Sequence, residues 1–296
     1  MMKVGFIGCV DSSRAALETL LGVDGLTVSA VVTRDKSTVN ADFCDLTDLC
    51  YINGIPIHFE DPKARTESVK FLESFDLDVI FCIGWSYLLD ESILTLPRIG
   101  VIGFHPASLP LNRGRHPIIW ALALGLEETA STFFLMDTGA DSGPIANQVH
   151  ISIEPDDNAT SLYEKILRVS KIQLAKLGED LVNGLLTFEE QEHSQATYWR
   201  KRNRKDGMID FRMSAETIHN LVRALAPPYP GAELVFGQGS IVVKKSMIAS
   251  ESYPLNIEPG KVLDRTCDAL LVKTAGTEAI WLFDIECGDI AIGDYL

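Results

Sequence analysis

The most constraining feature of the sequence is a near-continuous apolar run, K-V-G-F-I-G-C, at Lys3 to Cys9. A run of this kind is typical of a strand buried on both faces, as in a parallel sheet covered by helices. An amphipathic helix pattern follows, capped by Asp11 or Ser12 and running through Leu21, and a second strand pattern spans Thr27 to Thr33. This strand-helix-strand order predicts an α/β fold with a Rossmann-like parallel sheet flanked by helices.

The glycines of this opening, Gly5 and Gly8, do not complete the G-x-G-x-x-G pattern of dinucleotide-binding folds. We therefore expect them to serve the tight turn between the strand and the helix, because glycine tolerates close approach of other groups. A dinucleotide site is the alternative interpretation.

The length of the chain limits how many domains it can form, and its net charge limits which partners it can bind. The 296 residues suffice for one large domain, or for a large domain and a small one. The apolar content of 46% is that of an ordinary globular protein, and the net charge is −15. A protein that grips a phosphate backbone normally presents a basic face, so a nucleic-acid partner is not expected.

Cysteine usage and hydropathy indicate the compartment. No apolar run reaches the length of a membrane span, and the N-terminus has a strand pattern rather than that of a signal peptide. The six cysteines form no C-x-x-C pair, and Cys9 and Cys82 lie within apolar runs. We therefore expect a cytoplasmic protein with reduced thiols, no membrane partner and no metal site.

Two loops carry the residues that could take part in catalysis. The first lies in G-F-H-P-A-S-L-P-L-N-R-G-R-H-P at Gly103 to Pro117, and the second in M-D-T-G-A-D-S-G-P-I at Met136 to Ile145. If His105 and Asp141 follow two parallel strands joined by a crossover helix, both lie at the carboxyl edge of the sheet. Open α/β sheets bind ligands at that edge. We therefore expect a base and its orienting carboxylate there.

The C-terminal third has a different pattern. The polar, charge-dense stretch Glu189 to Gly207 predicts an interdomain linker. Beyond Ala232, five short strand patterns separated by glycines predict a small OB-like β-barrel. We expect a catalytic domain over residues 1–195, a linker over 196–207 and a C-terminal domain over 208–296.

Several motifs together resemble one family. They are His105, Leu109-Pro110, Arg113-Gly114, the D-x-G-x-D-x-G of Asp137 to Gly143, A-T-Y-W-R-K-R-N-R-K-D-G-M-I-D-F from Ala196, and R-A-L-A-P-P-Y-P-G-A from Arg223. The chain is similar in these motifs to the 10-formyltetrahydrofolate-dependent formyltransferases, which include methionyl-tRNA and nucleotide-sugar enzymes. The resemblance covers nearly the whole chain and implies 10-formyltetrahydrofolate as the formyl donor.

The resemblance also implies residue roles. His105 would help to deprotonate the attacking amine, and Asp141 would orient the imidazole and stabilise its protonated form. Independently of the resemblance, the two arginines in N-R-G-R suit anion recognition, so we expect Arg113 and Asn112 to contact the substrate. The residues that would bind the folate are Tyr87, Leu88, Leu89, Arg115, Asp137, Thr138, Gly139 and Ala140.

One position departs from the family pattern. The family has an asparagine where this chain has Gly103, and that side chain holds the formyl oxygen on which negative charge develops. The loss of one such donor typically costs on the order of 10²–10³ in rate. The candidate replacements are Asn112, Ser108, the backbone amide of Gly103 and a bound water.

The expected reaction is formyl transfer from 10-formyltetrahydrofolate to the amine of a small acceptor, an amino sugar linked to a nucleotide. One alternative is methionyl-tRNA formylation. Another is a folate- or nucleotide-sugar-binding homologue with little catalysis, which Gly103 motivates, and a third is hydrolysis of the formyl folate. A homodimer is left open.

Overall fold

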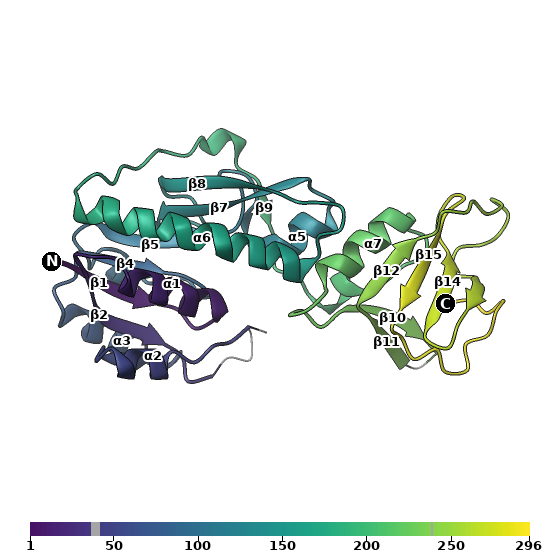
Figure 1. Ribbon diagram of the computed structural model, residues 1–296, viewed down its shortest axis with the longest axis horizontal. Coiled ribbons are helices and arrows are strands. Elements are labelled where there is room, and N and C mark those ends of the chain that lie inside the picture. The colour runs from purple at the N-terminus through teal and green to yellow at the C-terminus, as the bar shows by residue number, and fades with distance from the viewer. Residues whose placement is uncertain (37–41, 238) are drawn as a thin grey trace. The chain divides into compact units, whose positions relative to one another are not determined.

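The computed structural model describes residues 1–36, 42–237 and 239–296 (Figure 1). The chain folds into two compact units. The first comprises residues 1–114, 129–151 and 164–198, and the second comprises residues 115–128, 152–163 and 199–296. Two internal segments therefore belong with the C-terminal part, and the domain boundaries predicted at residues 195 and 207 stay a prediction.

A seven-stranded sheet in the order β3-β2-β1-β4-β5-β7-β8 forms the centre of the first unit. The strands from β3 to β5 run parallel. Their bounds are β1 Met2–Ile7, β2 Leu26–Thr33, β3 Ile57–Phe59, β4 Val79–Cys82, β5 Gly100–His105, β7 Glu128–Leu135 and β8 Ile145–Ser152. This arrangement confirms the predicted α/β class.

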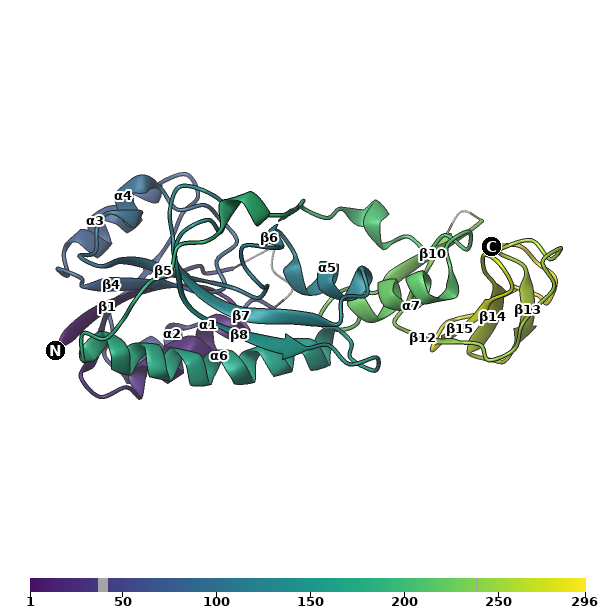
Figure 2. The same ribbon diagram turned by 90° about the horizontal axis from the view of Figure 1, so that it is seen from above.

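Helices cover both faces of this sheet (Figure 2). They are α1 Asp11–Leu21, α2 Thr47–Ile52, α3 Arg65–Glu73, α4 Glu91–Leu94 and α6 Ala159–Val182. Figure 2 shows α3 and α4 on the face opposite α1 and α6. None of the helices in the described part of the chain is both long and apolar enough to cross a membrane.

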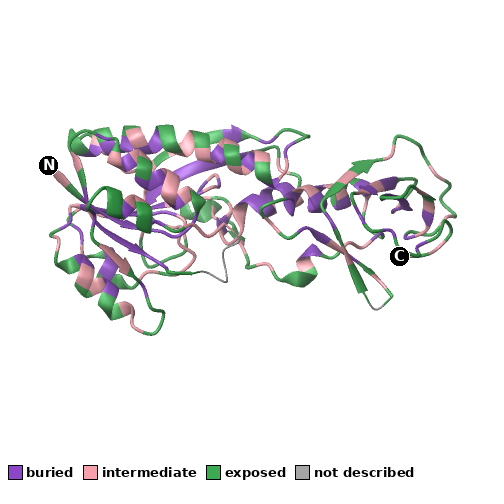
Figure 3. Ribbon diagram, turned by 60° about the horizontal axis from the view of Figure 1, so that its bottom comes forward, coloured by how far each residue is buried: buried purple, intermediate pink, exposed green. Residues whose placement is uncertain are grey.

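Burial on both faces explains the apolar run at the N-terminus. Phe6 packs with Leu17 of α1 and Leu174 of α6 in one cluster, while its neighbour Ile7 packs with Leu72 of α3 in the other. Successive side chains of a strand point to opposite faces, so both faces require apolar residues. Figure 3 shows the central strands as almost wholly buried, whereas the surrounding helices alternate buried and exposed positions.

The turn from β1 into α1 is closed by its own residues. A Cβ on Gly8 would collide with the carbonyl oxygen of Ile83 and would lie 2.6 Å from the side chain of Ser13. The Ser13 hydroxyl donates to that carbonyl (2.6 Å) and accepts from the backbone N–H of Val10 (3.0 Å). Gly8 therefore serves the tight turn, as the sequence predicts.

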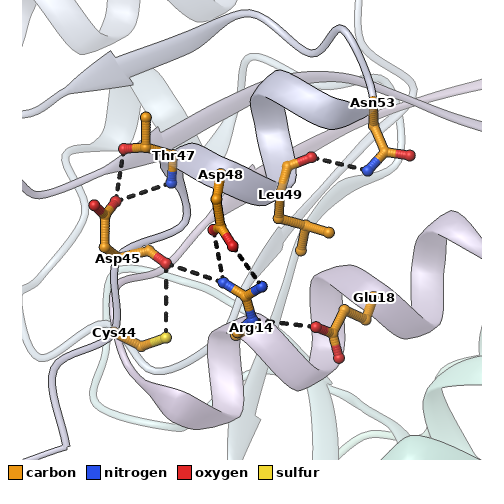
Figure 4. A network of polar contacts seen from close by, with 8 residues as sticks. All are labelled: Arg14, Glu18, Cys44, Asp45, Thr47, Asp48, Leu49 and Asn53. Carbon is orange, nitrogen blue, oxygen red and sulfur yellow. Dashed lines mark hydrogen bonds and ion pairs between the residues drawn. The ribbon is translucent and has the colours of Figure 1, made fainter.

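A polar network ties α1 to α2 (Figure 4). The Arg14 guanidinium donates to both carboxylate oxygens of Asp48, at 2.7 and 2.8 Å, and to Glu18 at 3.2 Å. The hydrogen bond from Arg14 lowers the pKa of Asp48 to about 2. The network therefore holds α1 against the first turn of α2.

The direction of β7 was predicted incorrectly. β5 and β7 pair antiparallel, with Gly103 opposite Phe134 and His105 opposite Thr132. The intervening helix α5, Pro117–Ala123, belongs to the second unit. It therefore does not form a crossover on the sheet, and an antiparallel neighbour needs none.

The second unit combines α5 and α7, Ala215–Ala224, with two small sheets. β10 pairs with β11, and four further strands follow the order β12-β15-β14-β13. The strands are β10 Ala232–Phe236, β11 Gly239–Val243, β12 Lys245–Ile248, β13 Val262–Arg265, β14 Ala269–Lys273 and β15 Ala279–Phe283. The sequence predicts all of these except β12, which only Lys244 separates from β11. Closure of the two sheets into a barrel stays a prediction.

Candidate active site

His105 ends β5 and is only 5% exposed. Its Nε2 lies 2.8 Å from the backbone oxygen of Asn112, and its Nδ1 lies 3.6 Å from Oδ2 of Asp141. The second distance is longer than a hydrogen bond, so the two side chains face one another without being bonded. The structure therefore brings together the histidine and the carboxylate that the sequence predicts to meet.

Asp141 reaches this place by a route that the sequence did not predict. The loop after β7 turns back on itself, with the amide of Leu135 bonded to the carbonyl of Pro144. Asp141 has a φ of 54°, in the left-handed region that residues other than glycine rarely adopt. Its Oδ2 accepts the backbone N–H of Gly114 at 2.8 Å. A loop conformation, rather than a strand end, thus aims the carboxylate at the histidine.

The surroundings of the imidazole suit a group that gains a proton. Both near neighbours of the His105 ring, the carbonyl of Asn112 and the carboxylate of Asp141, are acceptors. A neutral imidazole can donate to only one of them, whereas an imidazolium can donate to both. The site can therefore accommodate the charge that arises when the ring takes a proton from another group.

The two residues predicted to contact the substrate, Asn112 and Arg113, differ in their burial and in their hydrogen-bond partners. Asn112 contributes its carbonyl to His105, while its amide N–H donates to Thr197 Oγ1 (2.8 Å) and its side-chain Oδ1 receives the Thr197 hydroxyl (3.3 Å). Arg113 is 1% exposed, and its guanidinium donates to Tyr198 (2.9 Å) and to Gln191 (2.6 Å). Tyr198 is itself 62% exposed, and the contact of Arg113 with a substrate stays a prediction.

Gly103, the position of the family asparagine, is enclosed by apolar groups. A Cβ placed there would lie 2.7 Å from Cγ and 2.9 Å from Sδ of Met136, and 3.2 Å from Cε1 of Phe134. Met136 therefore occupies the space into which an asparagine side chain would extend. The donor that replaces the asparagine among the predicted candidates stays open.

The residues expected to bind folate lie on two loops. In the first, the Arg34 guanidinium sits 3.9 Å above the ring of Tyr87, while Leu88 is exposed and Leu89 half-buried. Arg34 is also paired with Glu60 at 3.1 Å, and both side chains are buried. In the second loop, residues 137–140 are exposed, and the Asp137 carboxylate accepts from the amide of Gly139 (2.9 Å). The folate-binding roles of both loops stay predictions.

The last predicted folate contact, Arg115, belongs to a cationic cluster in the second unit. Burial lowers the pKa of His116, and the positive charges of Arg115, Arg202 and Lys201 lower it further. Arg202 and Arg200 lie 4.9 and 5.3 Å from the ring of Trp120. We define the cationic cluster as Arg115, His116, Arg200, Lys201 and Arg202.

Sequence reasoning missed Gln191. It lies in the polar stretch interpreted as a linker, yet it is buried and donates to the backbone of the Asp141 loop. No motif marks it, because its neighbours are polar and exposed. A solitary amide in such a stretch gives no periodic signal from which burial could be inferred.

The sheet and its helices define an α/β protein with a histidine–carboxylate pair at the end of β5. Residues 50–176 match the family model described as formyl transferase, and residues 201–291 match that of the formyl transferase C-terminal domain. The chain is 32% identical over 290 residues to a methionyl-tRNA formyltransferase of Caldanaerobacter subterraneus, covering 96% of this chain and 92% of the relative. The protein belongs to the formyltransferase family and is a formyl-transferring enzyme.

Other relatives are named for other activities. The chain is 31% identical over 287 residues to the bifunctional polymyxin resistance protein ArnA of Wigglesworthia glossinidia brevipalpis, and it spans 42% of that protein and 96% of its own length. Among solved structures, the sugar 3N-formyltransferase WlaRD has a TM-score of 0.71 at 17% identity, over 96% of this chain and 97% of the other. An N-formyltransferase of Helicobacter canadensis has a TM-score of 0.73 at 17% identity, over 96% and 99%. These structures show a shared fold.

Proposed function

We propose that the protein transfers a formyl group from 10-formyltetrahydrofolate to the amine of a nucleotide-linked amino sugar. The observation that carries the proposal is the approach of Nδ1 of His105 to Oδ2 of Asp141, at 3.6 Å. The WlaRD structure contains 5-N-formyl-THF and dTDP, and the Helicobacter canadensis structure contains folinic acid and dTDP-3-aminofucose. These complexes support a folate donor and a sugar nucleotide as acceptor.

The proposed mechanism assigns the proton transfers to one side chain. The acceptor amine attacks the formyl carbon, and His105 takes the proton that the nitrogen must lose. Asp141 stabilises the resulting imidazolium, in the manner of a base with an orienting carboxylate. As the bond between the formyl carbon and the folate nitrogen breaks, His105 returns the proton to that nitrogen. At the end of the cycle His105 therefore carries the same number of protons as at the start.

The charge distribution supports a short, phosphate-bearing acceptor. Beside His116, the cationic cluster holds four charged side chains, Arg115, Arg200, Lys201 and Arg202, in a chain whose net charge is −15. Arg200 is also paired with Asp206. Guanidinium groups form strong charge-assisted hydrogen bonds with phosphate. Arg115 and His116 directly follow Gly114, whose amide N–H donates to Asp141. We expect the cluster to bind the phosphate groups of the acceptor.

A transfer assay with purified protein tests this proposal. 10-formyltetrahydrofolate is offered with dTDP- and UDP-linked amino sugars, with initiator methionyl-tRNA, and with no amine. We expect N-formylated sugar nucleotide, identified by its mass. Formate release without an amine would instead indicate a hydrolase, and folate binding without turnover on any acceptor would indicate a binding homologue.

Methionyl-tRNA is a second candidate acceptor, favoured by the 32% identity to a methionyl-tRNA formyltransferase over 92% of that enzyme. The two acceptors are separated by kcat/KM measured side by side, because discrimination is a ratio of these values. A higher kcat/KM for methionyl-tRNA than for every sugar nucleotide would overturn the sugar proposal. It would leave formyl transfer by His105 and Asp141 standing.

A further inference from the structure

Gln191 connects the Asp141 loop to the interior of the first unit. It is 5% exposed, and its Nε2 donates to the carbonyl of Asp141 (3.0 Å) and to that of Gly143 (2.6 Å). Its Oε1 accepts from Nη2 (2.6 Å) and Nε (3.2 Å) of Arg113. A primary amide has two N–H donors and one oxygen with two lone pairs. Both N–H donors and both oxygen lone pairs of the Gln191 side chain therefore take part in hydrogen bonds.

These bonds act on a strained residue. Asp141 has a φ of 54°, and a left-handed conformation of a residue other than glycine persists only where its surroundings enforce it. Gln191 holds the carbonyl of this residue and of the residue two positions later. The direction of the Asp141 carboxylate follows from the backbone that carries it, so Gln191 controls how Oδ2 faces His105.

The same segment holds the second partner of the imidazole. Thr197 accepts the amide N–H of Asn112 on its hydroxyl (2.8 Å) and that of Arg113 on its carbonyl (2.9 Å). Asn112 in turn presents its carbonyl to Nε2 of His105 at 2.8 Å. Residues 191–197 thus fix the groups on both sides of the ring.

We propose that Gln191 is a positioning residue: it sets the Asp141 loop so that the carboxylate faces His105. The expected effect on the rate of formyl transfer rests on the proposed function. The expected effect on the position of the Asp141 carboxylate does not, because it follows from the hydrogen bonds of Gln191 alone. The two readouts therefore distinguish failure of this inference from failure of the proposed function.

The experiment compares Gln191→Leu with Gln173→Leu. Gln173 is a matched control, because it is also buried and donates to the carbonyl of Ser131 (3.0 Å) and to Asn147 (2.6 Å). Crystal structures of the variants give the distance from Nδ1 of His105 to Oδ2 of Asp141, which is 3.6 Å in the native protein. We expect Gln191→Leu to lengthen this distance and to lower kcat by roughly 10²-fold, the cost of an ångström-scale misplacement. Gln173→Leu is expected to leave both unchanged.

A second variant, Gln191→Glu, keeps an acceptor for Arg113 but turns an oxygen toward the carbonyls of Asp141 and Gly143. This variant retains the bond to Arg113, so it tests the positioning role even if Gln191→Leu fails to fold. We expect it to lower kcat and to lengthen the distance between Nδ1 of His105 and Oδ2 of Asp141. Unchanged kcat and an unchanged distance in the folded variants would overturn the inference. A longer distance in a protein without transfer activity would support the positioning role and reject the proposed reaction.

Discussion

At the scale of single residues, the proposed chemistry depends on the two ring nitrogens of His105 and on the groups that face them. Replacement of His105 by alanine removes the group that takes the proton, and Asp141→Asn removes the charge that stabilises the imidazolium. General acid–base catalysis contributes about 10²–10⁴-fold, so we expect a loss of kcat of that order for each. Transfer rates and circular dichroism spectra check the prediction. Near-normal rates in folded variants would refute the assigned roles.

Gly103 offers a second test at this scale. Asparagine at this position must displace Met136, whose Cγ would lie 2.7 Å from the new Cβ. Overpacking of this kind typically costs about 1–3 kcal/mol. We expect Gly103→Asn alone to lower the melting temperature without raising activity. We expect the double variant with Met136→Ala to recover stability, because residues in contact are not additive. Full stability of the single variant would show that Met136 moves freely.

At the scale of elements, Arg34 joins the end of β2 to the segment after β3 through Glu60, with side chains that are 8% and 4% exposed. Removal of one partner of a buried pair typically costs about 3–5 kcal/mol, because the other charge stays uncompensated. We expect Arg34→Leu to lower the free energy of unfolding in urea by that amount. The control is Lys70→Met, which breaks the exposed pair with Glu67 and should cost little. Equal effects of the two variants would contradict the prediction.

Helix α7 carries a pH-dependent contribution to stability. Burial lowers the pKa of His219 below its ordinary value of 6.5, and the charge of Arg223 adds to the effect. The unfolded chain therefore binds a proton at a higher pH than the folded one does. Stability is then full above the unfolded pKa and decreases as the pH falls toward the folded value. We expect His219→Gln to lose less stability than the native protein between about pH 7.5 and pH 5.5 in urea titrations. Parallel curves for the two proteins would contradict this.

At the scale of the whole molecule, the second unit recruits α5 from the middle of the chain. This helix packs on α7, and both helices carry buried apolar side chains: Ile118 and Leu122 in α5, and Ile218 and Leu221 in α7. A fragment ending at Gly207 lacks α7, and we expect it to expose this apolar face and to bind a hydrophobic dye. A cooperative melt of the fragment without dye binding would contradict the expectation.

Much of the architecture was predictable because burial leaves a clear pattern. The apolar run of β1 and the glycine-punctuated strands of the second unit identify their elements from periodicity alone. The direction of β7 was not predictable, because a short helical pattern does not show which unit it packs against. The approach of His105 and Asp141 was predicted on the wrong geometric grounds, since a loop and not a strand end supplies the carboxylate. Gln191 could not be predicted, because its burial depends wholly on tertiary contacts.

The turn after β1 has a consequence for the compounds that the protein ignores. In dinucleotide-binding folds, the pyrophosphate lies against the glycines and the amide groups at the start of the first helix. Here the Ser13 hydroxyl and the crowding at Gly8 take up that space. We therefore expect that pyridine nucleotides, which are abundant in any cell, do not bind at this turn.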